Sequence, residues 1–172
     1  VYGSTRDHLL EAKVVLSDGS EAILKGLSPD EVNEKCKGNT LEACIYKRLI
    51  ALLSESDNQK EIRDNYPDRS LRRRNSGYAL DELLNSNYYD KEALDEPFNL
   101  CKILAGSEGT LAFVTELKVN LEPLPPSEKA VICVHCKTLE EAFAANLVAL
   151  EHKPVAIELM DDTILELSKK NI

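Results

Sequence analysis

The chain has 172 residues, a hydrophobic fraction of 43% and a formal net charge of −9. That hydrophobic fraction is enough to fill the core of one ordinary domain, or of one domain and part of a second, which excludes wholesale disorder. The acidic excess disfavours binding to nucleic acid or to anionic membranes. No apolar run approaches the roughly 18–20 residues of a transmembrane helix. We therefore expect no nucleic-acid partner and no transmembrane segment.

The five cysteines are odd in number and widely scattered, and no signal segment precedes the first charged residues. This pattern is typical of reduced thiols, so we expect a cytoplasmic location. Cys133 and Cys136 have CxxC spacing, but they lie in a predicted strand, where residues three apart point to opposite faces. Ordinary strand positions are favoured over a zinc site, and we assign no metal.

In the first half of the chain, strands are predicted over 9–16 and 21–25, around an Asp-Gly turn that is typical of a β-hairpin. Thr40 is expected to cap a helix that ends near Ser54, because the apolar residues between them follow helical spacing. The stretch from 28 to 68 is expected to be largely helical. Within it the chain turns polar after Ser54, with a break predicted at Asp57 and Asn58.

Farther along the chain, short helices are predicted over 78–84 and 98–104, and a strand over 110–121. Prolines at 123, 125 and 126 cannot continue that strand, so a domain boundary is expected there. Strands over 130–136 and 155–159 are predicted to flank a helix over 138–151, whose Thr138 and Glu141 have the spacing of a capping box. Another helix is expected from about Asp162.

The turn Gly106–Thr110 is the sharpest local feature of the sequence. A phosphate-binding loop would lead into a helix, but this turn leads from a helix into a strand, and Glu108 would repel a phosphate. The residues alone favour a plain turn, although its two glycines also allow backbone amides to approach a flat ligand. A basic cluster, Arg69 and Arg72 to Arg74, either offsets nearby acids in a solvated loop or binds an anionic substrate.

Three stretches together carry a family resemblance. The first lies within residues 2–19 and contains YGSTRDHLL and VVLSDG, the second is NSGYAL at 75–80, and the third is GSEGTLAFVTE at 106–116. Followed by the proline break and PVAIELMD at 154–161, they resemble the FAD-linked oxidase family. These FAD/FMN-containing flavoproteins include D-lactate and D-2-hydroxyglutarate dehydrogenases and glycolate oxidase subunits. The resemblance covers essentially the whole chain, although Ala112 stands where many members have glycine.

The resemblance implies an α+β fold. Residues 1–124 would form the second half of a PCMH-type FAD-binding domain, mostly antiparallel sheet with flanking helices. Residues 125–172 would begin the α+β cap, the FAD-linked oxidase C-terminal domain. The family's glycine-rich pyrophosphate loop, PGGGT in type, does not occur in the sequence, and Val1 is not an initiator methionine. We therefore expect an internal piece of a longer protein, with the catalytic residues farther toward the C-terminus of that protein.

The resemblance also implies a chemistry: FAD-dependent oxidation of a small-molecule 2-hydroxy acid, with hydride transfer to the flavin and reoxidation by an unidentified electron acceptor. The expected cofactor-binding residues are Tyr2, Gly3, Gly106, Ser107, Glu108, Gly109, Thr110, Leu111, Ala112, Phe113 and Val114. The expected substrate-side residues are Arg74, Asn75 and Tyr78. By itself the chain is expected to be inactive and to hold no FAD.

Two other classes of function stay open on the sequence. The chain could belong to a non-catalytic binding or assembly module that reuses the fold, because fold does not fix function. It could also belong to a different FAD-linked enzyme of the same superfamily, such as an oxidase, a lyase or an ether-lipid synthase. The stretch from 28 to 68 matches no functional motif that would decide between them.

Overall fold

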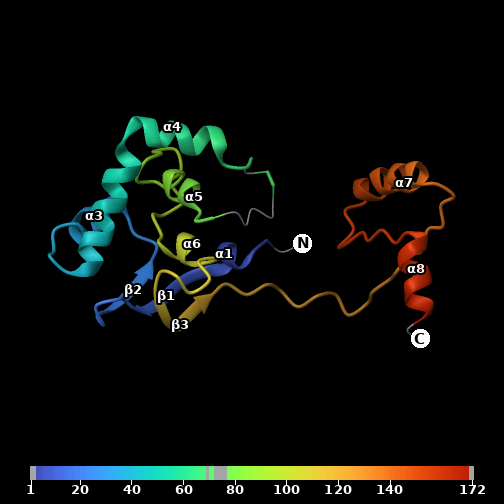
Figure 1. Cartoon of the computed structure of the whole chain (residues 1–172), viewed down its shortest axis with the longest axis horizontal. Coiled ribbons are helices and arrows are strands. Elements are labelled where there is room, and N and C mark those ends of the chain that lie inside the picture. Colours follow the sequence, from blue (N-terminus) through green and yellow to red (C-terminus); the bar gives the residue numbers. More distant parts are fainter. Residues whose placement is uncertain (1–2, 69, 72–76, 171–172) are drawn as a thin grey trace. The chain divides into compact units, whose positions relative to one another are not determined.

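The structure is a computed structural model in which residues 3–68, 70–71 and 77–170 are described (Figure 1). The chain forms two compact units, Tyr2–Glu122 and Pro123–Ile172. Among the described residues, no helix combines the length and the apolar character needed to cross a membrane.

A three-stranded antiparallel sheet in the order β2-β1-β3 forms one layer of the first unit. The predicted hairpin is present: β1 (Leu9–Val15) pairs with β2 (Glu21–Lys25). Gly19 closes the hairpin turn at φ +82°, a conformation that favours glycine. The third strand, β3 (Phe113–Val119), pairs with the other edge of β1 and is shorter than the predicted 110–121. The chain from 106 to 112 is instead used to turn from a helix into the sheet.

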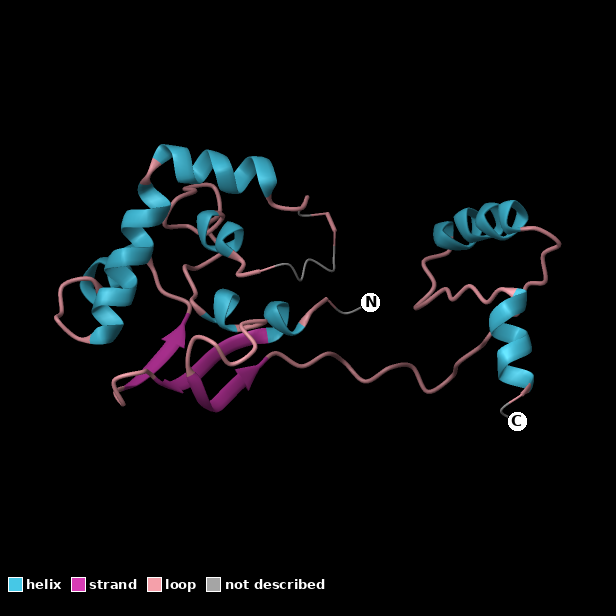
Figure 2. Cartoon of the chain, viewed as in Figure 1, coloured by secondary structure: helices cyan, strands magenta, loops and turns pink. Residues whose placement is uncertain are grey.

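The helices of this unit lie on one side of the sheet, as Figure 2 shows. They are α1 (Thr5–His8), α2 (Pro29–Lys35), α3 (Leu41–Ser54), α4 (Ser56–Asn65), α5 (Leu80–Leu84) and α6 (Cys101–Leu104). The predicted cap of α3 is confirmed, because the Thr40 hydroxyl accepts a hydrogen bond from the Ala43 amide at 3.2 Å. The unit is α+β as expected, with more helix and a smaller sheet than the sequence indicated.

The break predicted at Asp57 and Asn58 is wrong. The helical path bends at Glu55, and both residues lie in the first turn of α4. The side-chain amide of Asn58 donates to the Leu52 carbonyl at 2.9 Å, and that of Gln59 donates to the Leu53 carbonyl at 2.8 Å. These polar side chains therefore satisfy the last carbonyls of α3 and begin α4 in the same turn.

Phe98 belongs to the hydrophobic core and packs among three tyrosine rings. Its side chain is fully buried, and the centroid of its ring lies 5.8–6.5 Å from the ring centroids of Tyr46, Tyr88 and Tyr89. Its amide and carbonyl both pair with Leu27, just beyond β2. This anchorage fixes the chain immediately before α6, and hence the start of the turn that follows α6.

The second unit contains α7 (Leu139–Glu151) and α8 (Asp162–Lys169), close to the predicted helices. The strands predicted over 130–136 and 155–159 are not formed in its described residues, although both segments were expected from their alternation. A strand exists only when a neighbour supplies ladder hydrogen bonds, and no such neighbour is present among residues 123–170. Their apolar side chains are exposed, with Val131 at 89% and Val155 at 68%.

The capping box predicted for α7 is half confirmed. The Thr138 hydroxyl accepts from the Glu141 amide at 3.2 Å, as the spacing indicated. The Glu141 carboxylate, however, accepts from the amide of Lys137 and not from that of Thr138. The helix start is therefore stabilised by local hydrogen bonds, which need no tertiary contact.

The cysteines provide a test of the core. Cys44, Cys133 and Cys136 are exposed, Cys36 is half-buried and Cys101 is fully buried. Burial raises the pKa of the Cys101 thiol to about 11, so it stays protonated at pH 8. With a thiol reagent at pH 8 we expect rapid labelling of the three exposed cysteines, slower labelling of Cys36, and labelling of Cys101 only after unfolding. Mass spectrometry of timed digests measures this order, and early modification of Cys101 would contradict the packing.

Candidate functional site

The turn between α6 and β3 has an unusual backbone. Gly106, Glu108 and Gly109 all have positive φ, at +90°, +53° and +76°. A glutamate in this left-handed region costs roughly 1–2 kcal/mol, so the surrounding structure must hold it there. Ser107 is buried, and its amide donates to the Leu104 carbonyl at 3.1 Å. The Ser107 carbonyl in turn accepts from the Thr110 amide at 3.0 Å, which closes the turn.

The short helix α6 that carries this turn is held at both ends by buried polar side chains. At its start, the Asn99 side chain accepts from the Cys101 amide at 2.9 Å and donates to the Leu10 carbonyl of β1 at 3.1 Å. At its end, the Arg6 guanidinium donates to the Lys102 carbonyl at 3.0 Å and to the Ala105 carbonyl at 3.5 Å. A cation at a helix C-terminus also interacts favourably with the helix dipole. Arg6 and Asn99 therefore fix the position from which the turn begins.

The two glycines of the turn share a positive φ but differ in their surroundings. A Cβ on Gly106 would lie 3.4 Å from Nη2 of Arg6, an ordinary van der Waals contact, so the φ of +90° and not packing favours glycine at this position. A Cβ on Gly109 would meet no atom of the described residues within 4 Å. Packing in the described chain therefore gives no reason for glycine at position 109. The positive φ of Gly109 is the only reason that the described residues supply. The space beside Gly109 is open to a ligand.

Tyr78 joins the second resemblance stretch to the third. Its hydroxyl lies 2.8 Å from the Thr110 hydroxyl, which itself donates to the Ser107 carbonyl at 2.6 Å. The Tyr78 carbonyl accepts from the hydroxyl of Tyr66, just beyond α4, at 2.8 Å. Burial raises the pKa of Tyr66, so this hydroxyl remains a donor at neutral pH. The turn is thus tied to α4 through side-chain hydroxyl groups.

The turn exposes hydrogen-bond donors. The amides of Glu108 and Gly109 donate to no acceptor within the described part of the chain, and both residues are exposed. Two such adjacent amides can bind the oxygen or nitrogen acceptors at the edge of a flat ring. The carboxylate of Glu108 makes the same place unfavourable for a phosphate, as the sequence indicated.

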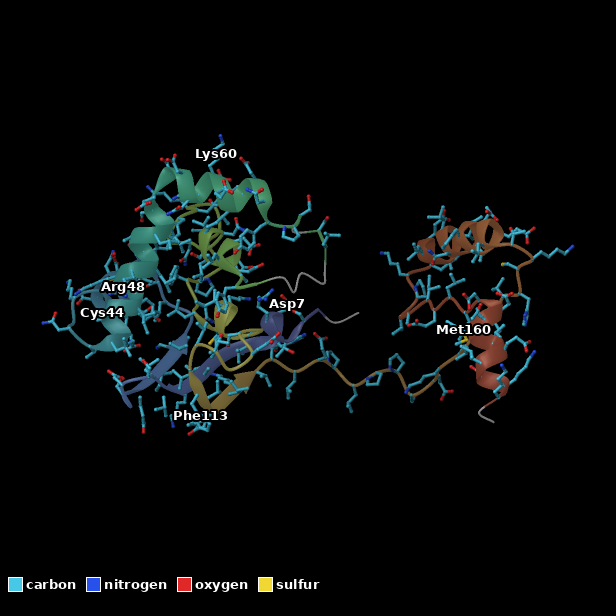
Figure 3. The ribbon with its side chains drawn as sticks, viewed as in Figure 1. Asp7, Cys44, Arg48, Lys60, Phe113 and Met160 are labelled. Carbon is cyan, nitrogen blue, oxygen red and sulfur yellow. The ribbon has the colours of Figure 1, made fainter. Side chains whose placement is uncertain are left out.

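The remaining expected cofactor-binding residues lie just before β3 and at its start, and they do not all face the same way. Val114 pairs with the buried Val14, next to a shift in register, and is itself 37% exposed. Phe113 pairs with Val15, lies on the opposite face and is 72% exposed (Figure 3). Leu111 is exposed, whereas Ala112 is half-buried against the core. Phe113 and Val114 therefore do not share one surface.

Gly3 has an internal reason to be glycine. It has φ +84°, and a Cβ there would lie 2.6 Å from a carboxylate oxygen of Asp7. That carboxylate accepts from the Ser4 amide at 2.6 Å and from the Ser4 hydroxyl at 3.0 Å. Although partial burial opposes ionisation, these hydrogen bonds hold the pKa of Asp7 below its usual value. Gly3 thus serves the start of α1, which accounts for it without a ligand.

Several expected site residues lie outside the described residues. They are Tyr2, Arg69, Arg72, Arg73, Arg74 and Asn75. Among the described residues, no group of three or more histidine, cysteine, aspartate or glutamate side chains is placed to hold a metal ion. The described site therefore consists of the turn, Tyr78 and the residues that hold them.

Sequence reasoning missed three residues that build this site: Arg6, Tyr66 and Asn99. Asn99 had a readable signal, because asparagine is a preferred cap just before a helix. Arg6 lies within a stretch that carries the resemblance, but its burial under α6 depends on a contact across about a hundred residues. Tyr66 gives no local signal, since its partner is a backbone carbonyl brought near by the fold.

The comparisons with known proteins point in one direction. The chain is 29% identical over 172 residues to a D-2-hydroxyglutarate dehydrogenase of Escherichia coli, 26% over 172 residues to one of Pantoea ananatis, and 27% over 171 residues to one of Haemophilus influenzae. These alignments cover 99–100% of the chain and 16% of each relative, so the chain spans about one sixth of their length. No protein-family model matches the chain, and no solved structure matches it. The expected resemblance to a family that includes these dehydrogenases is confirmed.

The anchoring role of Arg6 can be tested by mutation. Replacing Arg6 by alanine leaves the Lys102 and Ala105 carbonyls without their donor, and we expect a loss of about 2–3 kcal/mol in the free energy of unfolding. Arg48→Ala, on the exposed face of α3 (Figure 3), is the matched control and is expected to cost less than about 0.5 kcal/mol. Denaturant unfolding measures both. Equal losses would show that Arg6 is only another surface charge.

Proposed function

We propose that this chain is part of an FAD-dependent dehydrogenase that oxidises a 2-hydroxy acid. Its relatives are D-2-hydroxyglutarate dehydrogenases, aligned from end to end of the chain. In this proposal residues 1–124 are the second half of a PCMH-type FAD-binding domain. Residues 125–172 are the beginning of the C-terminal cap domain.

One observation carries the proposal. The three stretches on which the resemblance rests are far apart in the sequence, yet each contributes to one turn. Arg6 of the first stretch lies under the turn, Tyr78 of the second bonds to Thr110, and the third stretch is the turn itself. Stretches that served only separate local structures would have no reason to meet. Their convergence on an exposed backbone with open space supports a ligand contact there.

The donor set of the turn fits a flavin ring. When bound, FAD supplies the acceptor for the hydride that leaves the substrate carbon. The pyrimidine edge of a flavin carries carbonyl oxygens and ring nitrogens, which are acceptors for amides such as those of Glu108 and Gly109. The open space beside Gly109 lets a flat ring approach that backbone. The residues of this chain would thus orient the ring, while the pyrophosphate needs a binding loop that this sequence does not contain.

The missing pyrophosphate loop leads to a direct prediction. The 172-residue chain by itself should be colourless after purification, and titration with FAD should leave the flavin fluorescence unquenched. Much of the cofactor's anchoring in this proposal lies in other parts of the longer protein. A yellow preparation with one FAD per chain would contradict this expectation.

Gly109 tests the proposed contact in the full-length protein. Replacing Gly109 by valine puts a branched side chain into the open space and strains the backbone, at a cost of roughly 1–3 kcal/mol. Gly19→Val is a matched control, because Gly19 has φ +82° and also no neighbour within 4 Å, but lies in the hairpin turn. Both variants should lose similar stability. Only Gly109→Val should lose flavin, measured as the flavin-to-protein ratio of the folded fraction.

The two outcomes separate a ligand contact from a plain turn. If Gly109→Val keeps full flavin content and an unaltered flavin spectrum, the turn is only a connector. If Gly19→Val also loses flavin, the loss reflects general destabilisation, and the contact is not supported.

A further inference from the structure

Hydrogen bonds made by three hydroxyl groups, those of Tyr66, Tyr78 and Thr110, link the chain just beyond α4 to the glycine turn. Tyr66 donates to the carbonyl of Tyr78 at 2.8 Å, and the Tyr78 hydroxyl lies 2.8 Å from that of Thr110. The Thr110 hydroxyl lies 2.6 Å from the Ser107 carbonyl. Because each hydroxyl has one proton, the direction of every hydrogen bond in this series can be assigned.

The Ser107 carbonyl determines which hydroxyl donates in each of these hydrogen bonds. A carbonyl oxygen has no proton, so the Thr110 hydroxyl must be the donor in that bond. Its single proton is then used, and Thr110 can only accept from Tyr78. Tyr78 must therefore donate its phenolic proton to Thr110. A hydroxyl that donates in this way is a better acceptor for a second partner.

This assignment determines what the exposed Tyr78 hydroxyl can bind. Tyr78 is 42% exposed, and its phenolic oxygen has only lone pairs left for a ligand. A carboxylate has no proton to donate at neutral pH, so it cannot pair with this oxygen. A ligand group that pairs with the Tyr78 hydroxyl must therefore carry an N–H or O–H. This requirement limits the substrate-side role expected for Tyr78.

We propose that Tyr78 is an acceptor-only contact that selects a hydrogen-bond donor of the bound ligand. This inference rests on the proposed function, which offers two such donors: the hydroxyl of the 2-hydroxy acid and the imide N–H of the flavin. Thr110 sets this preference by taking the phenolic proton, and Tyr66 holds the Tyr78 backbone in place.

The first experiment tests the substrate hydroxyl in the full-length protein. Dissociation constants are measured for the 2-hydroxy acid on the reduced protein and for the corresponding 2-oxo acid on the oxidised protein, so that neither ligand turns over. Tyr78→Phe keeps the ring but removes the acceptor. If the substrate hydroxyl is the donor, this variant raises the dissociation constant of the hydroxy acid by roughly three- to tenfold, which corresponds to the loss of one neutral hydrogen bond. The 2-oxo acid, which lacks that proton, should change by less than about twofold.

The second experiment tests the flavin imide. Protein stripped of cofactor is titrated with FAD and with FAD methylated at the imide nitrogen, and fluorescence quenching gives both affinities. If the imide is the donor, Tyr78→Phe lowers the affinity for FAD by roughly three- to tenfold and leaves the affinity for the methylated analogue unchanged. A selective loss in either experiment supports the proposal and identifies the donor.

Thr110 supplies a test that a merely structural role of Tyr78 would fail. Thr110→Val removes the acceptor of the phenolic proton, so Tyr78 becomes free to donate. The ratio of affinities between the donor ligand and its donor-free counterpart should then fall toward one. Thr110→Ser keeps the hydroxyl and should keep the ratio. Using the ratio cancels any general loss of affinity from a loosened turn.

The failures of the two proposals are distinguishable. A full-length wild-type protein that takes up no flavin would overturn the proposed function. Flavin uptake combined with equal effects of Tyr78→Phe on all four ligands, or with no effect on any, would overturn the assignment of Tyr78 alone. An unchanged affinity ratio in Thr110→Val would overturn the role given to Thr110.

Discussion

The site depends on one buried arginine. Arg6 donates to carbonyls at the end of α6, and α6 is too short to hold its place by its own backbone hydrogen bonds. Asn99 secures the other end of this helix against β1. With both ends fixed, the chain leaves α6 in a set direction and can hold a glutamate with positive φ. The position of the turn is thus set by buried polar side chains whose hydrogen bonds are satisfied.

An exposed turn that is held by buried contacts suits the binding of a flat ligand. Donors that are already in place need no reordering when a ring approaches, so less conformational entropy is lost on binding. In the glycine turn, Gly106 lies beside Arg6, whereas Gly109 borders open space among the described residues. The Tyr78 hydroxyl lies 2.8 Å from the Thr110 hydroxyl of the same turn, and in our proposal it adds an acceptor to these donors. A donor and acceptor pattern of this kind specifies a ligand more sharply than a charged surface does.

The two units differ in what holds them. In the first, one core cluster buries apolar side chains of the sheet and of α2 to α6, so packing stabilises these helices. In the second, α7 and α8 have no buried residue, and caps at Thr138 and Asp161 provide their local stabilisation. Helices held mainly by caps are marginal in water, and most helical stability in proteins comes from packing. Packing within the described part of the second unit therefore contributes little to α7 and α8, whose apolar side chains are largely exposed.

The sequence by itself determined the local features of this protein. The Asp-Gly hairpin, the Thr40 cap, the helices near 139–151 and 162–169, and the position of the glycine turn all follow from interactions between residues a few positions apart. The tertiary structure alone decided what requires distant partners. It left 130–136 and 155–159 without strand neighbours, began α4 with residues expected to break it, and buried Arg6 beneath the turn. It also oriented the Tyr78 proton, because a hydrogen bond has a direction only once both partners are in place.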